Sequence, residues 1–310
     1  MRVAVIDLGT NTFHLLIAEG EQDGSFQPLH HETLVVRIGK GGISQGVLTE
    51  EAYRKTRRAL SHFRRQVDQY AVPIDKVFAT ATSAIRNARN GSQLVADIAQ
   101  ETGIRVQVIS GDQEAEYIYY GVRTAVPLGG ETGLIMDIGG GSVEFIIGNA
   151  DKIFWKRSFE IGAQRLLDKF MATDPISPPA IGRLNSYLEE ALIPLTNAVH
   201  QYAPKGLVGA SGTFETLCAI EAEKQGQPLN VEELVEGSLS LTAFREIFRE
   251  LVTKDRAGRL AIPGMVEMRV DMIVVASCLL NFVLTRYGLQ AIKVSGYALK
   301  EGVLVSILNS

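Results

Sequence analysis

Short apolar runs alternate with polar, glycine-containing turns along the chain, and this alternation predicts strands and helices in a regular order. Residues 2–7 and 12–18 are two such runs on either side of a polar turn, which is typical of a hairpin. A third strand is expected at about 28–39. The next elements are expected in the order helix, strand, strand and helix, at about residues 49–70, 76–79, 105–109 and 110–122.

The second half of the chain follows the same plan. The pattern predicts strands at about 132–137, 142–148 and 152–160, a helix from Gly162, a strand at 207–209, a loop at 256–264, a long helix at 267–287, a strand at 291–295 and a last helix from Tyr297. Strands that first follow one another and then alternate with helices are typical of an α/β protein with mixed sheets.

A local repeat organises this plan. Residues 3–17 align without gaps on residues 133–147, so that each matched pair lies 130 residues apart. Asp7 then matches Asp137, Gly9 matches Gly139, Thr12 matches Ser142, and His14 matches Glu144. A repeat with the same apolar flanks indicates duplication of a whole domain. We predict domains at 1–124 and 125–310, with their polar turns facing each other across a cleft and a final helix, at about 297–310, able to pack back on the first domain.

The turn in the second copy carries the clearest chemical signal. Gly139, Gly140 and Gly141 remove every Cβ, so that backbone N–H groups can approach an anion closely, and Ser142 adds a hydroxyl. Asp137 and Glu144 place carboxylates on either side. An ordinary hairpin is the alternative for the glycines alone, whereas the flanking acids favour a phosphate-and-metal loop.

Other polar groups are expected near the same cleft. Ser83 lies where a predicted strand meets a helix, and Arg86 follows one turn later, where it could bind a phosphate through two N–H groups or simply lie on the helix surface. Glu114 opens a helix, where it is either a functional carboxylate or a cap favoured by the helix dipole, and for Glu116 we favour the cap. The turn Ser211, Gly212 and Thr213 occupies the place in the second half that Ala81 to Ser83 occupies in the first.

Composition and charge narrow the classes of function. The chain has 310 residues, 46% of them hydrophobic and 21% charged, with a formal net charge of −4. This acidic balance disfavours broad binding of nucleic acid. The two cysteines form no metal-binding or disulfide pattern. The apolar stretch 272–284 is shorter than the ~20 residues that a membrane span needs. We therefore expect a cytoplasmic protein that contacts no membrane.

The predicted helix at 49–70 carries a basic cluster of six residues, Arg54, Lys55, Arg57, Arg58, Arg64 and Arg65. Because they are spread around more than one helical face, we favour a solvated surface over a tract that binds anions.

Five stretches together resemble one family. Asp7-Leu-Gly-Thr-Asn-Thr12, Ala81-Thr-Ser-Ala-Ile-Arg86, Ile109-Ser-Gly-Asp-Gln-Glu114, Asp137-Ile-Gly-Gly-Gly-Ser-Val-Glu144 and Gly209-Ala-Ser-Gly-Thr213 are similar to motifs of the Ppx/GppA phosphatases. These are exopolyphosphatases and guanosine pentaphosphate phosphohydrolases. The resemblance extends over nearly the whole chain and implies two duplicated ribonuclease H-like domains of the actin-like ATPase fold. The chain ends after two domains, without the C-terminal helical extension of longer members, so we expect a short two-domain form.

The resemblance also implies residue roles. Glu114 corresponds to the glutamate that orients or deprotonates the attacking water, and Asp137 and Glu144 correspond to carboxylates that hold Mg²⁺ (or Mn²⁺) and assist that water. The expected phosphate- and substrate-binding groups are Asp7, Gly9, Asn11, Thr12, Ser83, Arg86, Gly139, Gly140, Gly141, Ser142, Ser211, Gly212, Thr213 and Arg259. A homodimer is the expected assembly.

The expected activity is Mg²⁺-dependent release of the terminal phosphate of inorganic polyphosphate or of guanosine pentaphosphate. This hydrolysis requires a water molecule positioned in line with the bond to be broken, a carboxylate that orients the water, and groups that stabilise negative charge on the phosphate oxygens. The sequence does not separate these two substrates. A sugar or acetate kinase of the same superfamily is a weaker alternative, because no sugar-site signature is evident. A non-catalytic sensor of guanosine polyphosphates or polyphosphate is the alternative from another class, and the intact carboxylates Glu114, Asp137 and Glu144 argue against it.

Overall fold

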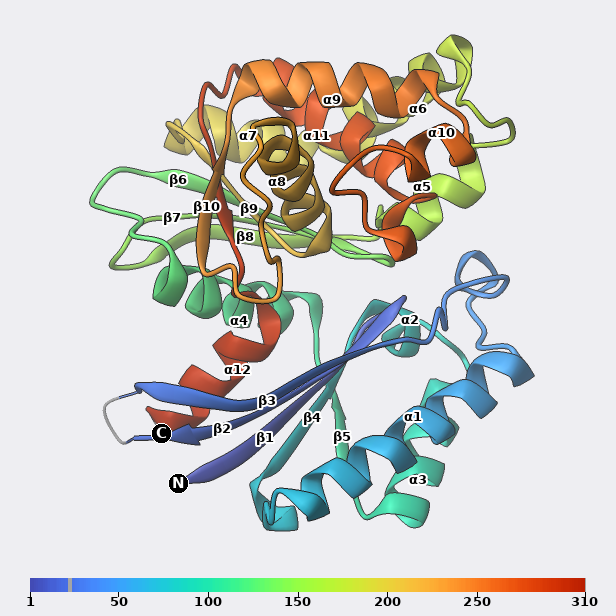
Figure 1. Cartoon of the computed structure of the whole chain (residues 1–310), viewed down its shortest axis with the longest axis vertical. Helices are drawn as coiled ribbons and strands as arrows, with labels where there is room; N and C mark the ends of the chain where they lie inside the picture. The colour runs from blue at the N-terminus through green and yellow to red at the C-terminus, as the bar shows by residue number, and fades with distance from the viewer. Residues whose placement is uncertain (22–23, 310) are drawn as a thin grey trace. The chain divides into compact units, whose positions relative to one another are not determined.

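The computed structural model of the protein describes residues 1–21 and 24–309. The chain divides into two compact units, Met1–Gly121 with the segment from Leu299 onward, and Val122–Ala298 (Figure 1). The predicted boundary between residues 124 and 125 lies close to this division, and the final helix groups with the first unit.

The first unit is built on a five-stranded mixed sheet with the strand order β3-β2-β1-β4-β5. β1, β2 and β3 form an antiparallel meander, and β4 and β5 add to the other side of β1 in parallel. The strands are β1 (Arg2–Leu8), β2 (Thr12–Gly20), β3 (Phe26–Val35), β4 (Val77–Ala81) and β5 (Val106–Val108). The predicted third strand therefore begins and ends earlier than expected.

Helices cover both faces of this sheet. α1 (Glu50–Gln69) and α3 (Gly91–Thr102) lie on one face, and α12 (Leu299–Leu308) lies against β1 and β2 on the other (Figure 1). The short helix α2 (Ser83–Arg86) follows β4, and α4 (Gly111–Ala125) leads out of the unit. Thr49 begins α1 by accepting a hydrogen bond from the Ala52 N–H at 3.1 Å, as an N-cap does.

The second unit contains a six-stranded mixed sheet with the order β10-β11-β9-β6-β7-β8. Its strands are β6 (Gly133–Ile138), β7 (Val143–Gly148), β8 (Ile153–Phe159), β9 (Leu207–Ala210), β10 (Glu236–Leu239) and β11 (Ile292–Ser295). Read from β8, the first five strands repeat the order and directions of the first sheet, and β10 is an additional antiparallel edge strand.

Seven helices accompany the second sheet in the described residues: α5 (Ala163–Phe170), α6 (Pro178–Ala191), α7 (Ile193–Tyr202), α8 (Gly212–Lys224), α9 (Leu241–Thr253), α10 (Arg256–Leu260) and α11 (Ile273–Tyr287). Two predictions were wrong here. The expected loop at 256–264 begins with α10, because the Asp255 side chain caps the Gly258 N–H at 2.8 Å. The expected helix at 267–287 is a short 3₁₀ turn, Glu267–Arg269, followed by α11.

The strand registers confirm the duplication. Asp7 lies opposite His14 in the β1–β2 pair, and Asp137 lies opposite Glu144 in the β6–β7 pair. Asp7 also pairs with Thr80 of β4, as Asp137 pairs with Ala210 of β9. All of these equivalent positions are 130 residues apart, so the sequence offset continues into a strand that the local alignment did not reach. The α/β fold with two duplicated ribonuclease H-like domains and mixed sheets is thus confirmed.

Alternation along the strands decides which side chains face the helices. In β6, Leu134, Met136 and Ile138 belong to the main core of the second unit, so Ile135 and Asp137 point to the opposite face. Asp137 is only 5% exposed and Glu144 only 1%. These carboxylates therefore lie at a buried position on the sheet face that the helical core does not fill.

The two cysteines are structural. Both lie in the core of the second unit, and burial raises the pKa of the Cys218 thiol to about 12 and that of Cys278 to about 12. Both thiols are therefore protonated at neutral pH, and neither is poised to act as a nucleophile. Across the described ranges, no helix has the length and apolarity that a membrane crossing requires.

Candidate functional site

The glycine turn between β6 and β7 is anchored by the start of α5. The N–H of Ala163 donates to the Gly139 carbonyl at 2.9 Å, the N–H of Gln164 donates to the Gly140 carbonyl at 2.8 Å, and the N–H of Gly162 donates to the Gly141 carbonyl at 3.3 Å. Nε of Arg165 adds a 2.8 Å bond to the Gly141 carbonyl. All three glycine carbonyls are therefore held by one segment.

This anchoring fixes the direction of the turn's N–H groups. In a trans peptide, the N–H of the next residue points away from the preceding carbonyl. The N–H groups of Gly140, Gly141 and Ser142 therefore point away from α5, and no protein acceptor receives them within the described residues. Successive N–H groups that face the same side of a glycine turn can form an anion-binding surface. The geometry fits the predicted phosphate loop at Gly139–Ser142.

A substitution at Gly162 tests whether this anchoring matters for activity. A Cβ on Gly162 would lie 2.4 Å from the Gly141 backbone carbon and 2.5 Å from the Gly140 carbonyl, so Gly162→Ala must displace the turn. Because small displacements of a catalytic site can lower rates by about 10²-fold, we expect a drop of that order in kcat/KM. Phosphate release measures it. Gly182→Ala is the matched control, because its Cβ meets nothing within 4 Å and the residue lies inside α6. Equal activity in the two variants would contradict the role given to the anchor.

Two buried carboxylates stand beside the turn. Directly opposite residues on an antiparallel pair have Cβ atoms about 4.5–5.5 Å apart on the same face, so the side chains of Asp137 and Glu144 are neighbours. Ser158 Oγ donates to Glu144 Oε1 at 2.6 Å, and Ser211 Oγ donates to Asp137 Oδ1. Hydroxyl donors thus orient both carboxylates.

The donor set fits a hard cation. Carboxylate oxygens are preferred by Mg²⁺, which typically takes one or two protein carboxylates and completes its shell with water and substrate phosphates. Within the residues that the structure describes, no group of three or more histidine, cysteine or acidic side chains is arranged around a metal position. A pair of carboxylates next to an anion-binding turn is the arrangement expected for a cation that arrives with its phosphate.

The turn that begins α8 completes this cluster. Ser211 has a positive φ of 74°, which is uncommon for a residue other than glycine and marks a locally strained backbone. A Cβ on Gly212 would lie 2.2 Å from the Arg269 guanidinium, so the arginine packs directly on this glycine. Burial lowers the pKa of Arg269, and the nearby carboxylates of Glu215 and Asp137 oppose that change. The guanidinium stays charged, because an arginine is deprotonated only far above neutral pH.

Sequence reasoning missed Arg269 as a member of this cluster. It lies in a stretch expected to be an ordinary long helix, and only the short turn Glu267–Arg269 brings its side chain to Gly212 and Asp137. Thr213 is buried at the start of α8. Nucleotide binding at Ser211–Thr213 stays a prediction.

The first unit holds the equivalent turn by the same device. Val36 and Arg37 donate their N–H groups to the Asn11 carbonyl at 2.9 and 2.8 Å, and Gly39 donates to the Thr10 carbonyl at 3.1 Å. The Gly9 N–H closes the turn by donating to the Thr12 carbonyl at 3.2 Å. In both units, therefore, the segment after the third strand holds the carbonyls of the turn and directs N–H groups away from itself.

The chemistry of the two turns differs. Where the second unit has Glu144 bonded to Ser158, the first has His14, whose Nδ1 lies 2.9 Å from Thr33 Oγ1 and whose Nε2 lies 2.9 Å from Thr12 Oγ1. Asp7 consequently faces an imidazole rather than a second carboxylate. The paired carboxylates that suit a cation occur at this turn only in the second unit.

A second cluster in the first unit joins Arg86 and Glu114. Arg86 Nη1 donates to Glu114 Oε2 at 2.6 Å and to the Ile109 carbonyl at 3.2 Å. The side chains are 16% and 8% exposed, so the pair is largely removed from water. Ser83, at the start of α2, is buried, with Asn87 Nδ2 3.3 Å from its Oγ. Glu114 is thus held in one orientation by an arginine, whereas Glu116 accepts from the Tyr120 hydroxyl at 2.8 Å.

Arg259 occupies a different position from the one expected. Its side chain is fully buried and donates to Asp174 Oδ1 at 2.6 Å, to the Lys254 carbonyl at 2.6 Å and to the Val270 carbonyl at 3.0 Å. Burial works to raise the pKa of Asp174, but hydrogen bonds from Arg259 and from the Arg256 backbone lower it overall. This arginine ties three segments together and leaves no exposed guanidinium for a phosphate. We therefore no longer count it among the substrate ligands.

The fold and these clusters define a class of protein. Two copies of one mixed sheet, each with a polar turn whose N–H groups are directed away from the segment that holds its carbonyls, describe a duplicated ribonuclease H-like protein with turns suited to binding phosphate. The model of the Ppx/GppA phosphatase family matches residues 16–310. The chain therefore belongs to the Ppx/GppA phosphatase family.

Solved structures agree with this assignment. An exopolyphosphatase from Cytophaga hutchinsonii is 45% identical over 100% of this chain and 98% of its own, with a TM-score of 0.95. A Ppx/GppA family member from Aquifex aeolicus is 26% identical over 99% of this chain and 97% of its own, with a TM-score of 0.81. Both similarities span the two units.

Proposed function

We propose that the protein hydrolyses the terminal phosphoanhydride of inorganic polyphosphate, releases orthophosphate and uses Mg²⁺ (or Mn²⁺). The observation that carries the proposal is the glycine turn: three N–H groups directed away from α5, with the buried carboxylates Asp137 and Glu144 beside them. A related exopolyphosphatase at 45% identity supports the choice of substrate.

Each group has a role that its surroundings support. The N–H groups of Gly140, Gly141 and Ser142 bind oxygens of the terminal phosphate and stabilise the charge that grows on them. Asp137 and Glu144 hold the cation, which neutralises charge on the phosphate oxygens when it is bound. Arg269 adds a fixed positive charge near Asp137. These groups supply positioning and electrostatic stabilisation, which are the main requirements of phosphoryl transfer.

Glu114 provides the base. A carboxylate can accept a hydrogen bond from the attacking water and orient it in line with the bond to be broken. The 2.6 Å contact with Arg86 fixes the carboxylate's rotamer. The water oxygen bonds to phosphorus, the anhydride oxygen leaves with the shortened chain, and the water proton passes to the carboxylate or to solvent.

One assay tests the proposal. Purified protein is incubated with long-chain polyphosphate, with tripolyphosphate and with guanosine pentaphosphate, each with and without Mg²⁺, and orthophosphate is measured. We expect release from polyphosphate that depends on the cation. Release from guanosine pentaphosphate alone would move the assignment to a pentaphosphate phosphohydrolase. Binding without release from any substrate would make the protein a sensor and overturn the proposal.

A further inference from the structure

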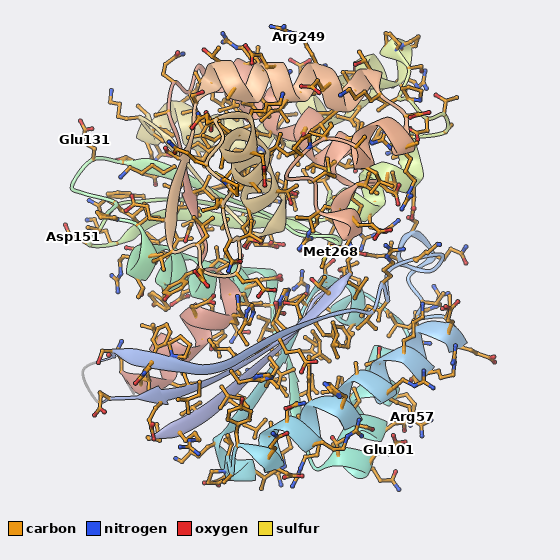
Figure 2. All side chains as sticks on the ribbon, viewed as in Figure 1. Arg57, Glu101, Glu131, Asp151, Arg249 and Met268 are labelled. Carbon is orange, nitrogen blue, oxygen red and sulfur yellow. The ribbon has the colours of Figure 1, made fainter. Side chains whose placement is uncertain are left out.

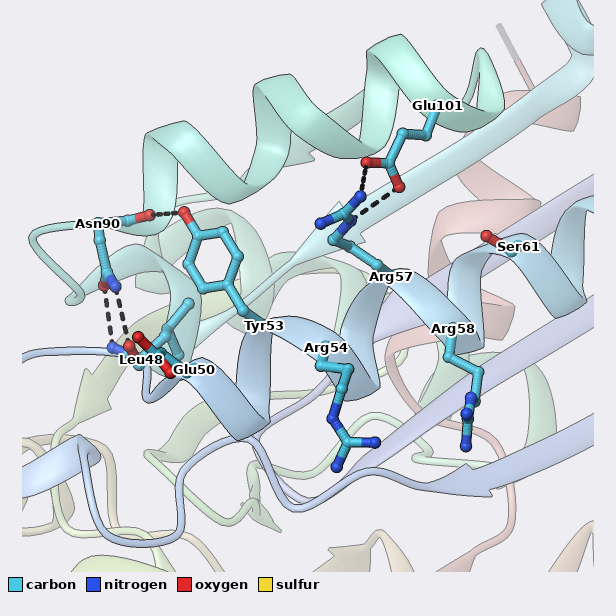
Figure 3. A pocket seen from close by; sticks show the side chains of 9 residues that line it. All are labelled: Leu48, Glu50, Tyr53, Arg54, Arg57, Arg58, Ser61, Asn90 and Glu101. Atoms are coloured by element: carbon cyan, nitrogen blue, oxygen red, sulfur yellow. Dashed lines mark hydrogen bonds and ion pairs between the residues drawn. The ribbon is translucent and has the colours of Figure 1, made fainter.

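The exposed side of α1 carries six cationic side chains that fall into two groups. Three of them are paired with acids: Lys55 with Glu51 at 2.7 Å, Arg64 with Asp68 at 2.9 Å, and Arg57 with Glu101 of α3. Figure 2 shows the last pair at the surface of the unit, and Figure 3 shows it from close by. These three charges are compensated locally.

The other three cations are Arg54, Arg58 and Arg65. All are exposed, and none forms an ion pair within the described part of the chain. At 3.6 residues per turn they lie within about 40° of one another around the helix and extend for about 16 Å along it. We call these residues the α1 arginine stripe. The six cations of the cluster are spread around the helix, but the three that form no ion pair lie on one side of it.

The stripe borders a hollow on the surface of the unit. Arg54, Arg58 and Ser61 line it together with Tyr53 and Asn90, and its volume is about 540 Å³ (Figure 3). In Figure 3, Arg54 and Arg58 extend in parallel to one side of α1, whereas Arg57 reaches to Glu101 on the other. Glu50 and the paired Arg57 and Glu101 also line the hollow, so its charged lining is three arginines and two glutamates, an excess of one positive charge.

The hollow is bordered by the segment that follows Arg86 in the chain. Asn90 lines it and also joins the segment after Arg86 to the start of α1: its Oδ1 accepts from the Leu48 N–H at 2.9 Å, and its carbonyl accepts from the Tyr53 hydroxyl at 2.9 Å. Four residues separate Arg86 from Asn90, so their Cα atoms are at most about 14 Å apart. Both positions belong to the first unit.

We infer that the α1 arginine stripe is a secondary binding site for the distal phosphates of a long polyphosphate chain. This inference rests on the proposed function for the identity of the ligand. A flexible polyanion with one charge on each internal phosphate complements a row of exposed guanidinium groups that form no ion pair in the described residues. Tripolyphosphate has a single internal phosphate, so it offers far fewer charges to a row of three guanidinium groups than a long chain does.

Two triple variants test the inference. Arg54→Gln/Arg58→Gln/Arg65→Gln removes the stripe, and Lys55→Gln/Arg57→Gln/Arg64→Gln removes the same formal charge from the paired cations of the same helix. KM and kcat are measured with long-chain polyphosphate and with tripolyphosphate, and binding of long-chain polyphosphate is measured directly over a range of salt concentrations.

Loss of the stripe is expected to weaken long-chain binding and raise the long-chain KM by about tenfold, because three exposed charge contacts are lost. It is also expected to reduce the dependence of binding on salt. The tripolyphosphate KM and both kcat values should stay unchanged. The control variant should alter long-chain binding much less.

If the two triple variants weakened binding of long-chain polyphosphate equally, the effect would be one of net charge, and the inference would be overturned. Unchanged long-chain binding in the stripe variant would overturn it as well. The readouts also separate this inference from the proposed function. Stripe-dependent binding without hydrolysis of any substrate would refute the activity and keep the site. Hydrolysis that is insensitive to the stripe would keep the activity and refute the site.

Discussion

Replacement of Glu114 by glutamine is expected to lower kcat for polyphosphate hydrolysis by about 10²–10⁴-fold, the usual contribution of a positioned general base. The amide keeps the size of the side chain but is a far weaker proton acceptor. Substrate binding should change little, because the groups assigned to hold phosphate are the glycine-turn N–H groups rather than this carboxylate. Steady-state kinetics with polyphosphate separate kcat from KM.

The contact between Glu114 and Arg86 complicates this variant, because removal of one partner of a buried ion pair can cost about 3–5 kcal/mol of stability. Thermal unfolding must therefore accompany the kinetics. Glu116→Gln is the matched control on the same helix, since Glu116 bonds to Tyr120 and has no role in the proposed chemistry. A folded Glu114→Gln protein with nearly normal kcat would show that Glu114 serves only structure.

Replacement of Asp137 by asparagine is expected to raise the Mg²⁺ concentration needed for half-maximal activity by at least about 10–100-fold. Loss of an outer-shell partner already costs that much in many metal sites, and Asp137 is assigned as a direct ligand. The amide retains one oxygen and can still accept from Ser211, so the local fold should survive. The measurement is a Mg²⁺ titration of phosphate release, together with direct binding of Mn²⁺ to the protein.

Ser211→Ala supplies a graded comparison, because it removes the hydroxyl that orients Asp137 but leaves the carboxylate in place. Its metal requirement should lie between those of the unmodified protein and Asp137→Asn. If Asp137→Asn lowered the rate without shifting either the Mg²⁺ titration or Mn²⁺ binding, the assignment of Asp137 as a metal ligand would be wrong.

Local sequence determined the parts of the site that lie on regular strands. Side chains alternate with a period of two along a strand, and so a gapless match of residues 3–17 to 133–147 implies that the two hairpins share one register. The structure supplied that register, in which Asp137 pairs with Glu144 and Asp7 pairs with His14. The role of the turn glycines could be predicted from the sequence because glycine is needed where the backbone must approach another group closely.

Side-chain contacts between segments far apart in the chain could not be predicted from the sequence. Arg259 looked like a loop cation near the site, and its burial depends on Asp174, which lies 85 residues earlier in the chain. Arg269 was overlooked because its contact with Gly212 requires the chain to leave the helical path before α11. Composition alone could not separate the paired cations of α1 from the unpaired ones, because one of the pairs crosses to α3.

The sequence by itself determined the duplicated fold and the family's acidic and glycine positions, since these depend on periodicity and on residues close together in the chain. The tertiary structure decided how the glycine turn is aimed. Its carbonyls are held by Gly162, Ala163 and Gln164, and only that contact turns three N–H groups away from α5. A hydrogen bond between segments about twenty residues apart leaves no periodic trace in the sequence, because it is made by backbone atoms that every residue carries.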